Sequence, residues 1–199
     1  MLMRGLRGGT EVHEPLPGTR QEVEAIAGKF KGGVVEKLLG AEASGQRLGE
    51  LLESGRLKGY RYIHFATHGV PNRERAFDSA LILSKKEEGV DGRVTAGEIL
   101  RRWSLEAELV VLSACQTAVG RHAGGEGYLG FAQALLLSGA EAVVASLWKV
   151  DDTATSLLME RFYENLLGQR SGLEERMRKG EALREALREL KEAKQEVEN

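Results

Sequence analysis

The chain has 199 residues, of which 42% are apolar and 29% charged, and its formal net charge at pH 7 is -2. This length suits one domain, or one domain with part of a second. The balanced charge argues against a general nucleic-acid binder or a protein of acidic membrane surfaces. The single cysteine, Cys115, excludes an internal disulfide framework and any metal site built from several cysteines.

The first residues lack the apolar core of a secretory signal, so we expect a cytoplasmic protein. The best candidate for a membrane span, residues 131–148, contains Gly139 and Glu141, which would be costly in lipid. A helix to Leu137, a glycine turn and a strand from residue 142 explain this run better. We therefore expect no membrane partner.

Residues 1–18 are expected to form a loop that contains two of the three prolines. A helix should begin at Thr19, because Thr19 and Glu22 form a capping-box pattern ahead of an apolar stripe. The periodicity then predicts, in chain order, a strand at 34–39, a helix that stops near Gly55, and strands at 60–66 and 80–84.

The second half of the chain begins with a short helix that Thr95 could cap. Residues 109–112, Leu-Val-Val-Leu, are typical of a strand that is buried on both faces of a sheet. Further elements are expected as a helix at 128–138, a strand at 142–148, a helix at 152–167 and a long charged helix at 173–197. Strands that alternate with helices predict an α/β fold with a largely parallel sheet.

Two of the predicted strands lead into residues that could take part in catalysis. His68 follows the strand at 60–66 and Cys115 follows the strand at 109–112. In α/β sheets functional groups gather beyond the carboxyl ends of strands, and a neighbouring imidazole makes a thiol a strong nucleophile. The backbone N–H groups of Gly69 and Cys115 could then stabilise an oxyanion.

A lone cysteine after a strand can equally be a buried core residue. His64, on the same strand as His68, is expected to be a core histidine. A metal site from these two histidines is disfavoured, because an i,i+4 pair shares one side only in a helix. The glycines of residues 120–130 could suggest a phosphate loop, but they match neither common nucleotide-binding pattern.

Two segments carry a family resemblance. Residues 62–69, Tyr-Ile-His-Phe-Ala-Thr-His-Gly, and residues 112–118, Leu-Ser-Ala-Cys-Gln-Thr-Ala, resemble the active-site motifs of CHAT domains, which are caspase-like cysteine peptidases. The resemblance continues through residues 125–130, 138–140, 146–152, 161–163 and 182–186. It spans about residues 19 to 193.

The resemblance implies a caspase-like three-layer sandwich at 19–199, with a mostly parallel sheet flanked by helices on both faces. It also implies that His68 is the general base and Cys115 the nucleophile of peptide-bond hydrolysis through a thioester, with no metal and no cofactor. Many family members begin with a further, non-catalytic half and close with an aromatic-rich strand. Neither pattern is evident here, and an unpaired sheet edge would favour self-association.

The acidic residues near the predicted site indicate a substrate preference. Candidate substrate-binding residues are Asp78, Ser79, Glu126, Asp151 and Asp152. Residues 147–152 resemble the segment by which separase, a related peptidase, receives an arginine side chain. We therefore expect cleavage after Arg or Lys. Asp152 could instead cap the following helix, and the loop arginines Arg73, Arg75 and Arg121 could form a pocket for Asp.

The implied partner is a protein or peptide substrate, and no nucleic acid is expected. A tetratricopeptide-repeat or other regulatory protein is a further candidate partner, because CHAT domains often accompany such repeats, and a homodimer is the expected form of self-association. The alternative function is a catalytically silent module of the same fold that binds a partner.

Overall fold

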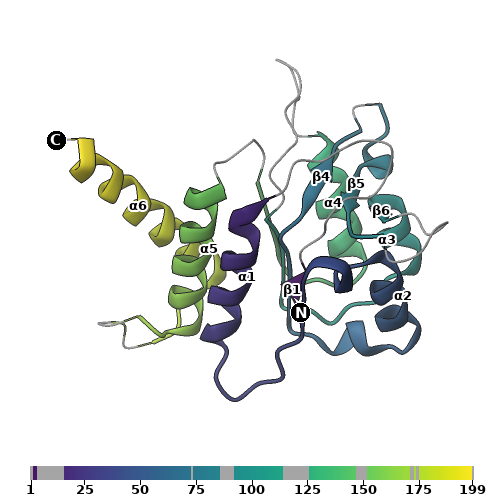
Figure 1. Ribbon diagram of the computed structural model, residues 1–199, viewed down its shortest axis with the longest axis horizontal. Helices are drawn as coiled ribbons and strands as arrows, with labels where there is room; N and C mark the ends of the chain where they lie inside the picture. Colours follow the sequence, from purple (N-terminus) through teal and green to yellow (C-terminus); the bar gives the residue numbers. More distant parts are fainter. Residues whose placement is uncertain are drawn as a thin grey trace. The chain divides into compact units, whose positions relative to one another are not determined.

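The computed structural model describes residues 2–3, 16–72, 74–85, 92–113, 126–146, 152–170, 173 and 175–198. The chain forms two compact units (Figure 1). Unit 1 comprises Met1–Leu16 and Glu36–Val150, and unit 2 comprises Pro17–Val35 and Asp151–Asn199.

Unit 1 is built on a parallel sheet of five strands in the order β2-β1-β3-β7-β8. Its strands are β1 (Leu2–Met3), β2 (Lys37–Leu38), β3 (Tyr62–Phe65), β7 (Leu109–Leu112) and β8 (Val143–Ala145). β3 and β7 are neighbours near the centre of the sheet, and all four residues of β7 are buried. Among the described strands, β8 lies at one edge.

A second, antiparallel sheet of unit 1 has the order β4-β5-β6. It consists of β4 (His68–Val70), β5 (Ala80–Ile82) and β6 (Arg93–Thr95). The helices of this unit are α2 (Gly45–Glu53), α3 (Ala96–Arg102) and α4 (Glu126–Leu137), and the short 3-10 turns are η1 (Gly40–Glu42), η2 (Arg56–Gly59) and η3 (Ala76–Asp78). Thr95 caps α3 as predicted, because its Oγ1 accepts a hydrogen bond from the N–H of Glu98 at 3.0 Å.

One apolar cluster fills the core of unit 1. The strands contribute Ile63, Phe65, Val110 and Leu112, and the helices contribute Leu48, Leu51, Ile99, Phe131 and Leu135. The rings of Phe65 and Trp103 lie 6.0 Å apart within this cluster. β3 and β7 are thus fixed by burial of their side chains as well as by their hydrogen bonds.

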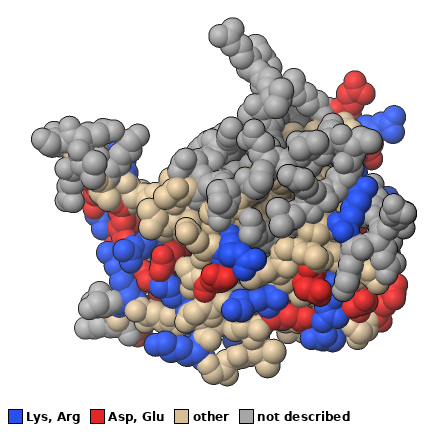
Figure 2. Space-filling view, in the orientation of Figure 1, with Lys and Arg blue, Asp and Glu red and all other residues tan. Residues whose placement is uncertain are grey.

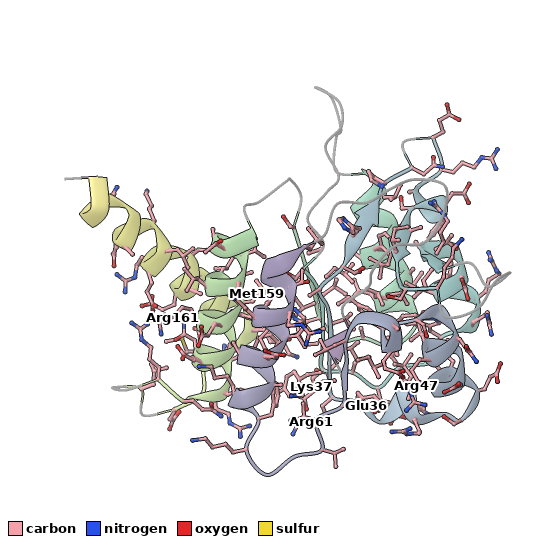
Figure 3. All side chains as sticks on the ribbon, viewed as in Figure 1. Glu36, Lys37, Arg47, Arg61, Met159 and Arg161 are labelled. Atoms are coloured by element: carbon pink, nitrogen blue, oxygen red, sulfur yellow. The ribbon has the colours of Figure 1, made fainter. Side chains whose placement is uncertain are left out.

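The carboxylate of Glu36 joins separate parts of unit 1. It accepts hydrogen bonds from Arg47 and Arg56 at 2.9 Å each and from the Tyr60 hydroxyl. Figure 3 labels Glu36 and Arg47 among the side chains. Burial alone would raise the pKa of Glu36, but these bonds and the arginine charges outweigh it, so the pKa lies below its ordinary value. The segment before β2 is therefore tied to α2 and η2.

Unit 2 consists of the helices α1 (Pro17–Lys29), α5 (Asp152–Leu167) and α6 (Lys179–Glu198). Its buried side chains include Val23, Ile26, Phe162, Tyr163, Ala182 and Ala186. The ammonium group of Lys29 in α1 binds Glu160 and Glu164 of α5 at 2.7 Å each. Apolar packing and these ion pairs hold the helices together.

The structure confirms a mixed α/β protein with a parallel sheet, and the bounds of β7 and α5 are as predicted. Several elements differ. β1 lies within the expected N-terminal loop, and α1 begins at Pro17, two residues early. The strand expected at 34–39 shrinks to two residues, and Val34 is 91% exposed. The last helix begins at Lys179, six residues late.

Candidate active site

The register of β3 and β7 determines which residues leave the sheet together. Phe65 and Leu112 are partners at the carboxyl ends of these adjacent parallel strands, and the N–H of Ser113 donates to the Phe65 carbonyl at 2.8 Å. His68 and Cys115 each follow one of these partners by three positions. Cys115 itself lies outside the described residues.

His68 is the first residue of β4 and is 4% exposed. Its register partner is Ile82 in β5, and the Thr67 hydroxyl donates to the carbonyl of that same residue. Gly69 is buried opposite Leu81 in the strand. The sequence did not predict a strand at 68–70, because pairing with a distant apolar strand, rather than a local pattern, sets the backbone here.

His64 occupies the interior of the sheet, as its place in the alternation predicts. It is fully buried in β3, and its register partners are Leu2 in β1 and Val111 in β7. His64 precedes His68 by four positions in the sequence, and it lies within β3 rather than beyond the end of that strand. The two histidines therefore occupy different environments.

Two predicted substrate-binding residues lie in the segment that joins β4 to β5. Asp78 is half-exposed, and its carboxylate lies 3.6 Å from the guanidinium of Arg75. Ser79 is fully buried, and its Oγ accepts a hydrogen bond from the N–H of Asn72 at 2.9 Å. This bond gives Ser79 a structural role, whereas Asp78 presents a carboxylate at the surface.

The other predicted site residues lie partly or wholly outside the described part of the chain. Asp151 is not described, and for Glu126 and Asp152 the structure describes the backbone alone. Glu126 is the first residue of α4 and Asp152 the first of α5. Asp152 is thus the first residue within this helix rather than the residue before it.

The loop arginines differ in exposure. Arg75 has a 78% exposed side chain, and Arg73 and Arg121 lie outside the described residues. On the face shown in Figure 2, described basic and acidic side chains lie close to one another. Some basic and acidic side chains form ion pairs, as Arg47 does with Glu50 at 2.7 Å.

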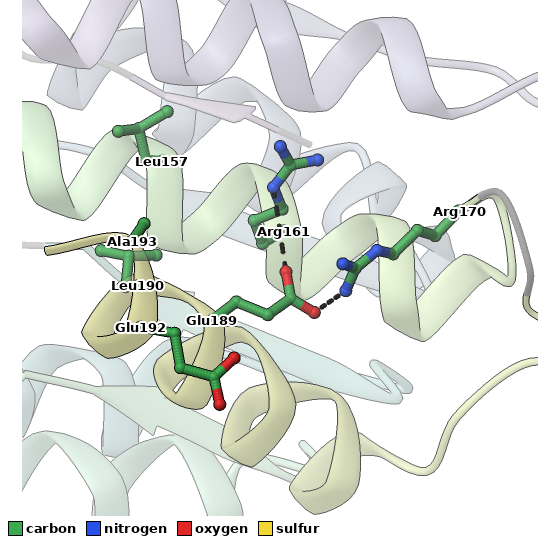
Figure 4. Close-up of a pocket in the computed structure, with 7 residues that line it drawn as sticks. All are labelled: Leu157, Arg161, Arg170, Glu189, Leu190, Glu192 and Ala193. Atoms are coloured by element: carbon green, nitrogen blue, oxygen red, sulfur yellow. Dashed lines mark ion pairs between the residues drawn. The ribbon is translucent and has the colours of Figure 1, made fainter. Parts of the chain in front are cut away.

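A cavity of about 340 Å³ lies within unit 2, between α5 and α6 (Figure 4). Its lining consists of Leu157, Arg161, Arg170, Glu189, Leu190, Glu192 and Ala193. The Glu189 carboxylate lies between the two guanidinium groups, 3.9 Å from that of Arg161. None of the predicted site residues whose side chains the structure describes contributes to this lining.

Within the described residues, no helix has the length and apolar character needed to span a membrane. The same residues contain no cluster of three or more His, Cys, Asp or Glu side chains arranged to hold a metal ion. The chemistry that the described part of the site can supply is that of the imidazole of His68 and of backbone N–H groups.

Sequence reasoning missed one contact near this site, the close approach of Gly130 in α4 to Ala76 in η3. The signal was present in the sequence, because a glycine inside a predicted helix often marks a close packing contact. Its partner could not be deduced, since Ala76 lies 54 positions earlier.

A parallel sheet whose central strands lead into a buried histidine and a cysteine-bearing segment is the arrangement of an α/β protein. Residues 7–198 match the CHAT domain. The chain belongs to the CHAT family, which is a caspase-like peptidase family.

One curated relative is Tetratricopeptide repeat protein 28 of Mus musculus. It is 35% identical over 91 residues, which are 46% of this chain and 4% of the mouse protein. The chain thus matches a small part of that relative.

Proposed function

We propose that this protein is a cysteine endopeptidase in which His68 and Cys115 form the catalytic dyad. The observation that carries the proposal is the register of β3 and β7, since Phe65 and Leu112 are partners and each precedes a dyad residue by three positions. Adjacent strands lie about 4.8 Å apart, so this spacing favours a thiol and an imidazole side by side. Family membership supports the same roles.

In the proposed mechanism, His68 accepts the proton of the Cys115 thiol, and the thiolate attacks the carbonyl carbon of the scissile bond. The N–H groups of Gly69 and Cys115 stabilise the oxyanion. Collapse of the tetrahedral intermediate breaks the C–N bond, and the imidazolium protonates the leaving amine. Water, deprotonated by His68, then hydrolyses the thioester and regenerates the thiol.

We further propose one catalytic domain with the caspase-like three-layer fold, made of residues 19–199 together with β1, which lies between β2 and β3 in the sheet. In this arrangement β8 is parallel to β7, with Ala145 as the partner of Leu112. β8 thus ends at the same carboxyl edge of the sheet as β3 and β7, and in the sequence Asp151 follows Ala145 by six positions. This supports a role for Asp151 and Asp152 in binding the substrate residue before the scissile bond.

A thiol-reactive peptide probe distinguishes the peptidase from a silent binding module. We expect the probe to label Cys115 in the parent protein and to label a His68→Ala variant at least tenfold more slowly, because the thiolate is no longer favoured. Mass spectrometry of the modified peptide measures the labelling. Equal rates in the two proteins, or no labelling of the folded parent, would show that the dyad is not assembled.

We expect cleavage after Arg rather than after Asp. A buried charge without a partner costs several kcal/mol, so carboxylates at the pocket should favour a basic side chain by about 100-fold or more. Two fluorogenic peptides that differ only at this residue measure the preference. Faster turnover of the Asp peptide would contradict it, as would an Asp151→Ala, Asp152→Ala double variant that still prefers Arg.

A further inference from the structure

The segment that follows the His68 strand, residues 71–79, is cross-linked by its own hydrogen bonds. We call this segment the His68 loop. Asn72 donates its N–H to Ser79 Oγ at 2.9 Å, and its side-chain carbonyl accepts from the N–H groups of Glu74 and Arg75 at 3.0 and 2.9 Å. The N–H of Asp78 donates to the Arg75 carbonyl at 2.8 Å. These bonds hold the described residues of the loop together, and the loop follows directly after Val70, the last residue of β4.

The His68 loop touches α4 where no side chain can be accommodated. A Cβ atom on Gly130 would lie 2.4 Å from the carbonyl oxygen of Ala76 and 2.7 Å from its carbonyl carbon. Both atoms belong to the backbone, so no side-chain rotation can relieve the overlap. Gly97 of α3 approaches the same loop less closely, with a Cβ 3.2 Å from the Phe77 carbonyl oxygen.

α4 directly follows the segment that carries the proposed nucleophile. Residues 114–125, which include Cys115, run from the end of β7 to the first residue of α4, Glu126. The contact between Gly130 and Ala76 thus joins the loop that follows one dyad residue to the helix that follows the other.

We propose that Gly130 is a positioning residue of the peptidase site, which sets α4 against the His68 loop at the distance that brings His68 and Cys115 together. This inference rests on the proposed function. Any side chain at position 130 must move the His68 loop and α4 apart by about 1 Å, and a misplacement of that size can reduce turnover about 100-fold.

The test is Gly130→Ala, with two readouts. Turnover of the Arg peptide should show kcat reduced roughly 10- to 100-fold, with KM changed less than about threefold. The rate of Cys115 alkylation by iodoacetamide, measured against pH, should shift its midpoint upward toward about 8.5, the ordinary pKa of a thiol. The second readout needs no peptidase activity.

Gly139→Ala is the matched control, because it is the same substitution at the other end of α4. Gly139 has a φ of +107°, and a Cβ there would lie 2.1 Å from the Leu105 carbonyl oxygen. This variant should lose at least as much thermal stability as Gly130→Ala, while the alkylation midpoint stays within about 0.3 pH units of the parent. Gly97→Ala should change kcat less than about threefold, since its overlap is small.

The outcomes separate the two proposals. If the alkylation midpoint of the parent does not depend on His68, as a His68→Ala variant would show, the proposed function fails. If the midpoint does depend on His68, but Gly130→Ala keeps the midpoint and the kcat of the parent, the proposed positioning role of Gly130 is wrong. Equal midpoint shifts in Gly130→Ala and Gly139→Ala would also overturn it.

Should Gly130→Ala fail to fold, Ala76→Gly gives the backbone of η3 more conformational freedom at the point that Gly130 approaches, without adding an atom. It is expected to raise the alkylation midpoint in the same direction, and an unchanged midpoint would overturn the inference.

Discussion

Replacing Cys115 with alanine is expected to reduce peptide hydrolysis by at least about 10³-fold while leaving the fold almost unchanged. Removal of the proposed nucleophile leaves no atom to form the thioester, and losses of this order or larger follow such deletions. The packing lost with one sulfur atom costs about 1 kcal/mol, against a total stability of about 5–15 kcal/mol. Turnover of the fluorogenic Arg peptide and a melting curve measure the two effects.

Cys115→Ser provides the matched control for this experiment. This substitution replaces the thiol with a hydroxyl of similar size, so the melting temperature should stay close to that of the parent. A serine oxygen is, however, a far weaker nucleophile beside a lone imidazole. Retention of more than about one per cent of the parent's activity in Cys115→Ala would contradict the proposed role. A large loss of stability would instead identify Cys115 as a core residue.

The strands that could be predicted are those whose own residues form an apolar pattern typical of a buried strand. β7 has four consecutive apolar residues and needs no distant information, and its bounds were predicted correctly. β1 has only Leu2 and Met3, and its place between β2 and β3 depends on pairing with residues that lie more than 30 positions away. A pattern of two residues cannot indicate such pairing.

The same distinction applies to the candidate site. The sequence identified His68 by its place after a strand, but it could not show that β4 begins there, because that strand exists through pairing with β5. Ser79 was predicted to bind substrate from its position beside Asp78. Its burial and its bond to Asn72 arise from the folding of the His68 loop, which no local pattern encodes.

The two histidines should differ in what their substitution does to turnover. His68→Ala is expected to reduce turnover by at least about 10³-fold, because it removes the proposed base from the end of the sheet, and to lose some stability because His68 is also buried. His64→Ala is expected to lower the free energy of unfolding by roughly 2–4 kcal/mol, since it leaves a cavity at a fully buried position of β3. Denaturant unfolding and peptide turnover are measured on both variants, and each result is compared with that of the parent protein.

The comparison is informative because both histidines are buried and lie only four residues apart, so a nonspecific loss of stability would affect both variants alike. A loss of turnover in His68→Ala alone requires that one imidazole lies within the sheet, between Leu2 and Val111, and that the other lies beyond its carboxyl end. A His64→Ala variant that lost activity at an unchanged melting temperature would reverse the assignment. The general base would then have to reach the thiol from inside the sheet, and the register argument from Phe65 and Leu112 would fail with it.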